Sequence, residues 1–157
     1  MLKKHWKVYA FWIAFSELVG LIAGLLTREG TRVYQMTVAQ PPLSPPGWLF
    51  PVVWTILYAL MGISAARIWL SEDSADKKRS VNLFIAQLAV NFFWPMFFFN
   101  LQAYGFSIVW LILLWVLVFL LILNNRKIEM PATWLLVPYL IWLTFALYLN
   151  IGVYLLN

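Results

Sequence analysis

The sequence predicts an all-α membrane protein, a five transmembrane helix bundle with a long proline-rich first loop as a cap. Two observations lead to this prediction. Hydrophobic residues make up 64% of the 157-residue chain, whereas ordinary globular proteins contain about 45–50%. They gather in five runs, each close to the roughly 20 residues that a helix needs to cross a bilayer. The runs are residues 6–26, 47–70, 81–101, 106–123 and 131–156.

Helices are the expected form of these runs because lipid offers no water to satisfy backbone amides. The runs also lack the alternation of polar and apolar residues that marks the strands of a membrane barrel. Since the spans use nearly the whole chain, residues 1–157 are expected to form a single domain. Cysteine is absent, which excludes disulfides, thiolate nucleophiles and cysteine metal sites.

The basic residues are distributed unevenly between the two sides of the predicted bundle. Nine fall in the N-terminal tail and the second and fourth connections, whereas the first connection has two. The nine are Lys3, Lys4, Lys7, Arg67, Lys77, Lys78, Arg79, Arg126 and Lys127, and the two are Arg28 and Arg32. The positive-inside rule then predicts a cytoplasmic N-terminus and a C-terminus on the opposite side. Membrane topology and contact with lipid headgroups therefore explain the net charge of +5. Nucleic acid is not an expected partner.

The first connection, residues 27–46, is long for a bundle with short loops. Loops of this length are usually lids, binding loops or disordered segments. Four prolines, Pro41, Pro42, Pro45 and Pro46, restrict the backbone here and lower the entropy lost on ordering it. We therefore expect a fairly rigid cap, followed by Trp48 at an interfacial depth.

The first span carries an acidic residue and a pair of glycines. A carboxylate inside a membrane is costly and usually marks a functional site, although Glu17 could instead be protonated and bonded to a neighbouring helix. Gly20 and Gly24 form a G-x-x-x-G pair that allows another helix to approach closely. The pair fits a packing face inside the bundle or a dimer contact.

Three spans carry aromatic and amide side chains at helical spacing. The stripes are Trp54 and Tyr58; Gln87, Asn91, Trp94 and Phe98; and Trp134, Pro138, Trp142, Ala146 and Asn150. Amides in hydrocarbon must face protein or a cavity, so we expect these stripes to point inward. They could form interhelical hydrogen bonds, or line a pocket for a flat apolar ligand with a few polar atoms. The proline-rich cap favours the pocket.

Templates for ordinary catalysis are missing from the chain. The single histidine, His5, lies in the N-terminal tail, and the sequence has no metal-ligand cluster, nucleophile elbow or phosphate-binding glycine loop. Acid–base catalysis would depend on Glu17 or Glu29 alone. Tryptophan radical chemistry or photochemistry at a bound pigment stays open.

Several short motifs, in order along the chain, resemble the translocator protein / tryptophan-rich sensory protein (TspO/MBR) family. They are EGTRVY at residues 29–34, SPPGW at 44–48, VWTILY at 53–58, QLAVN at 87–91 and PYLIW at 138–142. The resemblance implies a five-helix bundle that is commonly a homodimer. It also implies binding of porphyrins such as protoporphyrin IX, of isoquinoline carboxamides and, in animal members, of cholesterol.

The resemblance also assigns roles to individual positions. Trp54 and Trp142 match two pocket tryptophans that are linked in bacterial relatives to light-dependent porphyrin breakdown. Tyr58, Asn91, Phe98 and Ala146 match other wall positions, and Tyr34 matches a cap residue. Val33 and Leu43 stand where the family has tryptophan, which predicts weaker porphyrin affinity and degradation. Ile151 and Leu155 replace the tyrosine and basic residue of the sterol motif, so sterol recognition is expected to be weak or absent.

The expected function is an integral membrane receptor for porphyrins and related flat apolar ligands, in a pocket between the helices under the first loop. The predicted ligand-binding residues are Tyr34, Trp54, Tyr58, Gln87, Asn91, Trp94, Phe98, Trp142 and Ala146. No metal or cofactor is required, and the porphyrin is a ligand. The alternatives are a light-dependent porphyrin-degrading enzyme, in which Trp54 and Trp142 would take part in the chemistry, a tetrapyrrole transporter, or a purely structural membrane partner.

Overall fold

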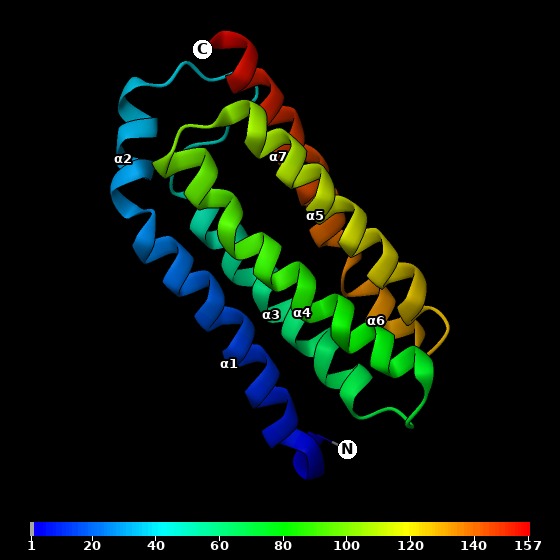
Figure 1. The fold of residues 1–157 in the computed structure, drawn as a ribbon. Helices are drawn as coiled ribbons and strands as arrows, with labels where there is room; N and C mark the ends of the chain where they lie inside the picture. The colour runs from blue at the N-terminus through cyan, green and yellow to red at the C-terminus, as the bar shows by residue number, and fades with distance from the viewer. Residues whose placement is uncertain (1) are drawn as a thin grey trace.

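The computed structural model describes residues 2–157, with side chains from His5 onward, and the regular elements in that part of the chain are helical. The elements are α1 (Leu2–Leu26), α2 (Arg28–Thr37), α3 (Leu49–Trp69), α4 (Ala75–Pro95), the π-helical turn η1 (Met96–Asn100), α5 (Tyr104–Asn125), α6 (Met130–Trp134) and α7 (Val137–Leu156). The long helices run side by side in an elongated bundle, with α1 along one edge (Figure 1).

Five helical stretches are long and apolar enough to cross a membrane, which confirms the predicted fold class. They are His5–Leu26, Leu49–Trp69, Ala75–Asn100, Tyr104–Asn125 and Met130–Leu156. Many large apolar side chains remain exposed along them, as expected where the surroundings are lipid chains as apolar as leucine. The chain is therefore an integral, multi-pass membrane protein.

The first connection was expected as a loop over residues 27–46, but its first half is helical. Helix α2 follows α1 after Thr27 alone. Its buried residue is Tyr34, whose ring lies 5.4 Å from the ring of Phe98 and 5.2 Å from that of Phe99. This docking orders a segment whose charges alone suggest a solvated loop. The four prolines lie in the non-helical remainder, residues 38–48, which we call the proline segment.

The third and fifth spans also differ from the predicted ranges. Helix α4 starts at Ala75 because Ser74 caps it: Ser74 Oγ accepts a hydrogen bond from the backbone N–H of Lys77. The fifth span is interrupted between α6 and α7. Pro138 lies in the first turn of α7 and has no N–H to donate to the preceding turn, so a helix can restart there but not run through.

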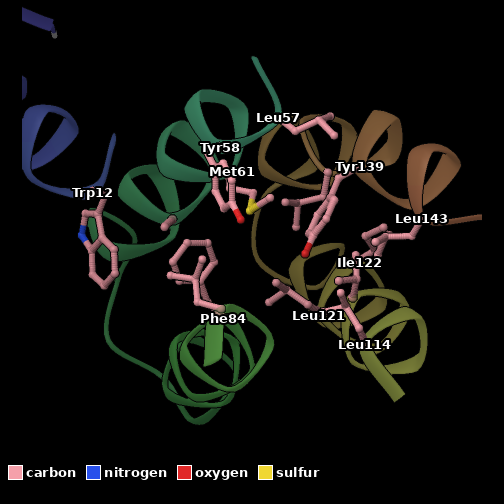
Figure 2. Close-up of a cluster of buried hydrophobic side chains, with 14 of the residues drawn as sticks. Trp12, Leu57, Tyr58, Met61, Phe84, Leu114, Leu121, Ile122, Tyr139 and Leu143 are labelled. Atoms are coloured by element: carbon pink, nitrogen blue, oxygen red, sulfur yellow. The ribbon is translucent and has the colours of Figure 1, made fainter. Parts of the chain in front are cut away.

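The core joins side chains from all five long helices, with Leu114 and Leu121 coming from α5 (Figure 2). Trp12 comes from α1, Tyr58 and Met61 from α3, Phe84 from α4, and Tyr139 from α7. Met61 and Tyr139 have no exposed surface. Helix α1 packs mainly on α3, α4 packs on α5, and α5 packs on α7.

The two ends of the bundle differ in charge. The start of α1 and the α3–α4 and α5–α6 connections lie at one end, which we call the basic end (Figure 1). Its described basic residues are Lys7, Arg67, Lys77, Lys78, Arg79, Arg126 and Lys127; Lys3 and Lys4 lie outside the residues whose side chains are described. Helix α2, the proline segment and the C-terminus lie at the other, the cap end. The cytoplasmic orientation of the N-terminus stays a prediction.

Exposed tryptophans mark both ends of the bundle. Trp69 and Trp134 are 48% and 65% exposed at the basic end, and Trp48 is 67% exposed at the cap end. Indole rings prefer the boundary between lipid and water. These residues therefore indicate where the two membrane surfaces cross the bundle.

Glycines allow α1 to lie close against α3. A Cβ added at Gly20 would overlap the ring of Tyr58, and one added at Gly62 would overlap the backbone of Ile13. At Gly24, by contrast, an added Cβ would meet nothing within 4 Å. Packing inside the bundle thus accounts for Gly20 but not for Gly24.

We expect Gly62→Leu to destabilise the bundle, because the new side chain must push α1 away from α3. Overpacking of this kind typically costs about 1–3 kcal/mol, which lowers the melting temperature by several degrees. Gly24→Leu is the matched control, since it places the same side chain on the same pair of helices in open space. Thermal unfolding in detergent measures both variants, and an equal loss in Gly24→Leu would contradict the packing described here.

Candidate functional site

A chain of buried hydrogen bonds crosses the middle of the bundle. Tyr58 Oη donates to Asn91 Oδ1 at 2.7 Å, Asn91 Nδ2 donates to Tyr139 Oη at 2.6 Å, and Tyr139 Oη donates to Gln87 Oε1 at 2.7 Å. All four side chains are buried. The chain links α3, α4 and α7, so these groups form the interhelical bonds that were one of the two interpretations of the stripes.

A group of aromatic rings lies beside this chain, where α3 faces α7. The ring of Trp54 lies 5.6 Å from that of Tyr58, 6.2 Å from that of Tyr139 and 6.4 Å from that of Trp142. Phe50 contacts Trp142 at 5.9 Å. Because these rings fill the space between the two helices, we call this region the α3–α7 seam. Trp54 and Trp142 are both half-buried.

One fully buried polar atom in the seam is left without a partner. Trp142 Nε1 is buried and forms no hydrogen bond within the described part of the chain. Most buried N–H groups in proteins are paired, and an unpaired one costs about 1–3 kcal/mol. This donor is therefore a place where an added acceptor would stabilise the protein.

A second aromatic group joins the end of α4 to α2. Trp94 stacks on Phe98 at 4.8 Å, and Phe98 contacts both Tyr34 and Tyr104. Trp94 Nε1 donates to Asn150 Oδ1 of α7 at 3.2 Å. Pro95 precedes the π-helical turn η1, whose wider turn keeps Trp94 and Phe98 on one face. Such turns are frequent at functional sites.

Helix α2 is held on this group by close backbone contact. A Cβ at Gly30 would overlap the side chain of Asn100 and come within 2.9 Å of the carbonyl of Phe99. Asn100 Nδ2 also donates to the carbonyl of Leu26 at the end of α1. The junction of α1 and α2 thus rests directly on η1.

The ionisable groups of α2 separate into a buried and a solvated set. Burial raises the pKa of Tyr34 to about 12, with a smaller contribution from Tyr104, so its hydroxyl stays protonated at physiological pH. On the exposed face, the hydrogen bond from Arg32 lowers the pKa of Glu29, and the charge of Arg32 adds to this effect. Arg32 and Glu29 therefore remain an ion pair at neutral pH.

The structure divides the nine predicted site residues between two touching groups. The seam and its hydrogen-bond chain contain Trp54, Tyr58, Gln87, Asn91 and Trp142, and Ala146 belongs to the core cluster that these residues adjoin. The second group contains Tyr34 and Phe98, and Trp94 packs against both. Their role in binding a ligand stays a prediction. In this structure the polar atoms of Tyr58, Gln87 and Asn91 bond to protein groups.

The predicted stripe on the fifth span is wrong in its first half. Trp134 and Pro138 are exposed, whereas Ala146 and Asn150 are buried. A spacing of four residues advances about 40° around the helix at each step, and the break before α7 adds to this drift. The buried face of α7 instead runs through Tyr139, Leu143, Ala146, Asn150 and Val153.

Sequence reasoning missed Tyr139 and Phe50 as members of the site. The signal for Tyr139 was present, because it lies four, seven and eleven residues before buried positions of α7, which is the spacing of one helix face. Phe50 lies near the start of α3 and carried no comparable signal. Glu17, which was left open, forms no hydrogen bond or ion pair with the described side chains and lies one turn from Gly20.

The hollows described on the protein lie away from the seam. A cavity of about 10 Å³ at the basic end has polar groups from Ser64, Ser80 and Asn125, and is large enough for about one water molecule. A second, shallow hollow lies on the outer face of α4. From His5 onward, no group of three histidine, aspartate or glutamate side chains is placed to hold a metal ion.

The fold and interior define a class: an all-α, five-span membrane protein whose core carries aromatic rings and amides in place of charges. The model of the TspO/MBR family matches residues 12–156, and the chain belongs to that family.

Named relatives cover most of the chain. It is 38% identical to a tryptophan-rich protein TspO of Chlorobaculum tepidum over 94% of both chains. It is 35% identical to a translocator protein of Bos taurus, over 85% of this chain and 80% of the relative. A tryptophan-rich sensory protein of Cereibacter sphaeroides is 34% identical over 75% of this chain and 73% of its own length.

We expect Gly30→Val to release α2 from η1, because its side chain would occupy the space of Asn100 and the Phe99 carbonyl. Hydrogen exchange of the α2 amides should quicken by roughly tenfold, the factor that corresponds to about 1.4 kcal/mol of overpacking. Gly47→Ala is the control, since its Cβ would meet only the amide of the exposed, flexible Gln35 side chain at 3.1 Å. Unchanged protection of α2 in Gly30→Val would show that this contact does not hold the helix.

Proposed function

We propose that the protein binds a flat apolar ligand of the porphyrin type at the α3–α7 seam, with a hydrogen-bond acceptor of the ligand paired to Trp142. The observation that carries the proposal is the unpaired, buried Trp142 Nε1. Porphyrins such as protoporphyrin IX combine a broad apolar ring with carboxylates at the edge. An isoquinoline carboxamide offers a smaller ring system with an amide carbonyl, and serves as a second probe.

The surroundings of Trp142 suit a ligand of this shape. Trp54 and Phe50 present large ring faces and edges beside it, and aromatic walls with a few polar groups are typical of small-molecule sites. The backbones of α3 and α7 lie apart, and the two helices meet mainly through these rings. A ligand can therefore enter by displacing side chains, without breaking a helix-to-helix backbone contact.

Contacts between the proline segment and the end of α7 support a cap at this end of the seam. Tyr148 Oη donates to the carbonyl of Pro42 at 2.6 Å, and Asn157 Nδ2 donates to the carbonyl of Ala39 at 2.9 Å. Pro41 is buried against Gly152. These contacts tie the segment to the last turns of α7, so it moves with the helix that carries Trp142.

We expect Trp142→Phe to weaken protoporphyrin IX binding about 3- to 10-fold, the factor expected for one lost hydrogen bond. The ring contacts largely remain, and removal of an unpaired donor should leave the melting temperature equal or higher. The Soret absorbance of the ligand, titrated with protein in detergent, measures the affinity. Trp134→Phe is the matched control, because Trp134 is exposed outside the seam. Equal affinity in wild type and Trp142→Phe would refute the proposed contact.

A second candidate function is light-dependent degradation of the bound porphyrin. The observation that favours it is the edge-to-face contact of Trp54 with Trp142 at 6.4 Å, which places two oxidisable indoles beside the proposed ligand. Under illumination in air, loss of the Soret band should be faster with wild type than with Trp54→Phe if an indole takes part. Bleaching at the rate of free porphyrin in both proteins would leave binding as the function.

A further inference from the structure

We propose that the outer face of α4 at the basic end binds the phosphate headgroup of an anionic phospholipid. A shallow hollow there is lined by Ala75, Lys78, Arg79, Asn82, Leu83 and Ala86. Their spacing of three and four residues places all six on one face of the helix. The hollow is basic and polar toward the end of the bundle and apolar toward its middle.

Most of this face of α4 points away from the protein; at its edge Leu83 packs against the core and Arg79 reaches Asn124 of α5. The buried residues Ser80, Phe84, Gln87 and Asn91 follow the same spacing on the opposite face of α4. Helices α1, α3 and α5 pack on that buried face. The hollow therefore opens toward the lipid, and a lipid molecule is the partner that reaches it from within the membrane.

The basic side chains of the hollow keep N–H donors that are available to a ligand. Lys77 pairs with Asp73 at 3.0 Å, whereas Lys78 Nζ forms no hydrogen bond or ion pair with the described side chains. Arg79 Nη1 lies 3.5 Å from Asp76 Oδ1 and 3.5 Å from Asn124 Oδ1. These are long contacts that orient the guanidinium while its other nitrogens remain available. Lysine and arginine donors in this arrangement suit phosphate oxygens.

The hollow extends along the membrane normal over a length that matches one leaflet of the bilayer. Lys77 Nζ lies 5.6 Å from the centre of the Trp69 ring, and exposed Trp69 marks the membrane boundary at this end. From Ala75 to Ala86 the helix rises about 16 Å, roughly half of the 30 Å hydrocarbon layer. Lys78 and Arg79 thus lie at headgroup depth, and Leu83 and Ala86 lie beside the acyl chain.

The charge of the whole end favours an anionic lipid over a neutral one. The sequence assigns nine basic and four acidic residues to the tail and connections of this end. Basic residues next to a membrane attract anionic headgroups. The small side chains of Ala75 and Ala86 leave room on the helix surface between the longer side chains of Lys78, Arg79 and Leu83.

Native mass spectrometry of the full chain, released from micelles that contain equal phosphatidylglycerol and phosphatidylcholine, tests this site. Wild type should retain phosphatidylglycerol in preference to phosphatidylcholine. Lys78→Gln with Arg79→Gln should reduce that retention by about 10- to 30-fold, since each basic residue near the surface contributes about 1 kcal/mol. Arg126→Gln with Lys127→Gln is the matched control, because it removes the same charge from the same end outside the hollow. Equal loss in both double variants, or no preference in wild type, would overturn the proposal.

A second variant separates the lipid from a bare phosphate ion. Ala86→Phe fills the apolar part of the hollow and keeps both cations, so it should also reduce phosphatidylglycerol retention. Millimolar inorganic phosphate should compete weakly, because it lacks an acyl chain. Full displacement by phosphate together with unchanged retention in Ala86→Phe would assign the hollow to a free anion and overturn the lipid site.

Discussion

The rest of the bundle depends on the hydrogen-bond chain through Tyr58, Asn91, Tyr139 and Gln87. Lipid chains are as apolar as the side chains they surround, so burial of leucine drives helix association much less in a bilayer than in water. Interhelical hydrogen bonds contribute about 0.6–2 kcal/mol each in this setting. Three such bonds join α3, α4 and α7. Because donors and acceptors must meet at one depth, they also fix the register of these helices.

This use of the polar groups decides what remains for a ligand. Tyr58, Asn91 and Gln87 are paired with protein atoms, and Trp94 is paired with Asn150. The seam is left with ring surfaces and one free donor that is fully buried, on Trp142. The seam would therefore recognise a ligand by its shape, by its ring contacts and by an acceptor placed at Trp142. It favours rigid aromatic ligands over flexible polar ones, since few polar groups of the ligand would find partners.

The transmembrane spans and the inward-facing amides could be predicted because any other arrangement has a large free-energy cost that can be read from the local sequence. An apolar run of about 20 residues has few alternatives to a membrane helix, and an amide such as Asn91 cannot face lipid. The helical fold of α2 could not be predicted from its own charges, because it depends on Tyr34 docking against Phe98 and Phe99. Trp134 was misplaced because a spacing of four residues drifts around a helix, and the break at Leu135 was not visible in the pattern. The membership of Phe50 in the seam depends on how far apart α3 and α7 lie, which no local pattern encodes.

The positions of the interhelical hydrogen bonds and ion pairs also indicate which part of the bundle can open. At the basic end, Arg67 bonds to Glu129, Ser64 Oγ donates to the carbonyl of Ala132, and Ser80 Oγ donates to Asn125. These bonds join α3 to α6 and α4 to α5. Between Tyr58 and the cap end, ring contacts of Phe50 and Trp54 join the first turns of α3 to α7. Ring contacts within the protein can be exchanged for ring contacts with a ligand. Breaking a buried hydrogen bond instead leaves a buried polar group without a partner. We therefore expect the seam to widen more easily between these rings than between the hydrogen-bonded helices of the basic end.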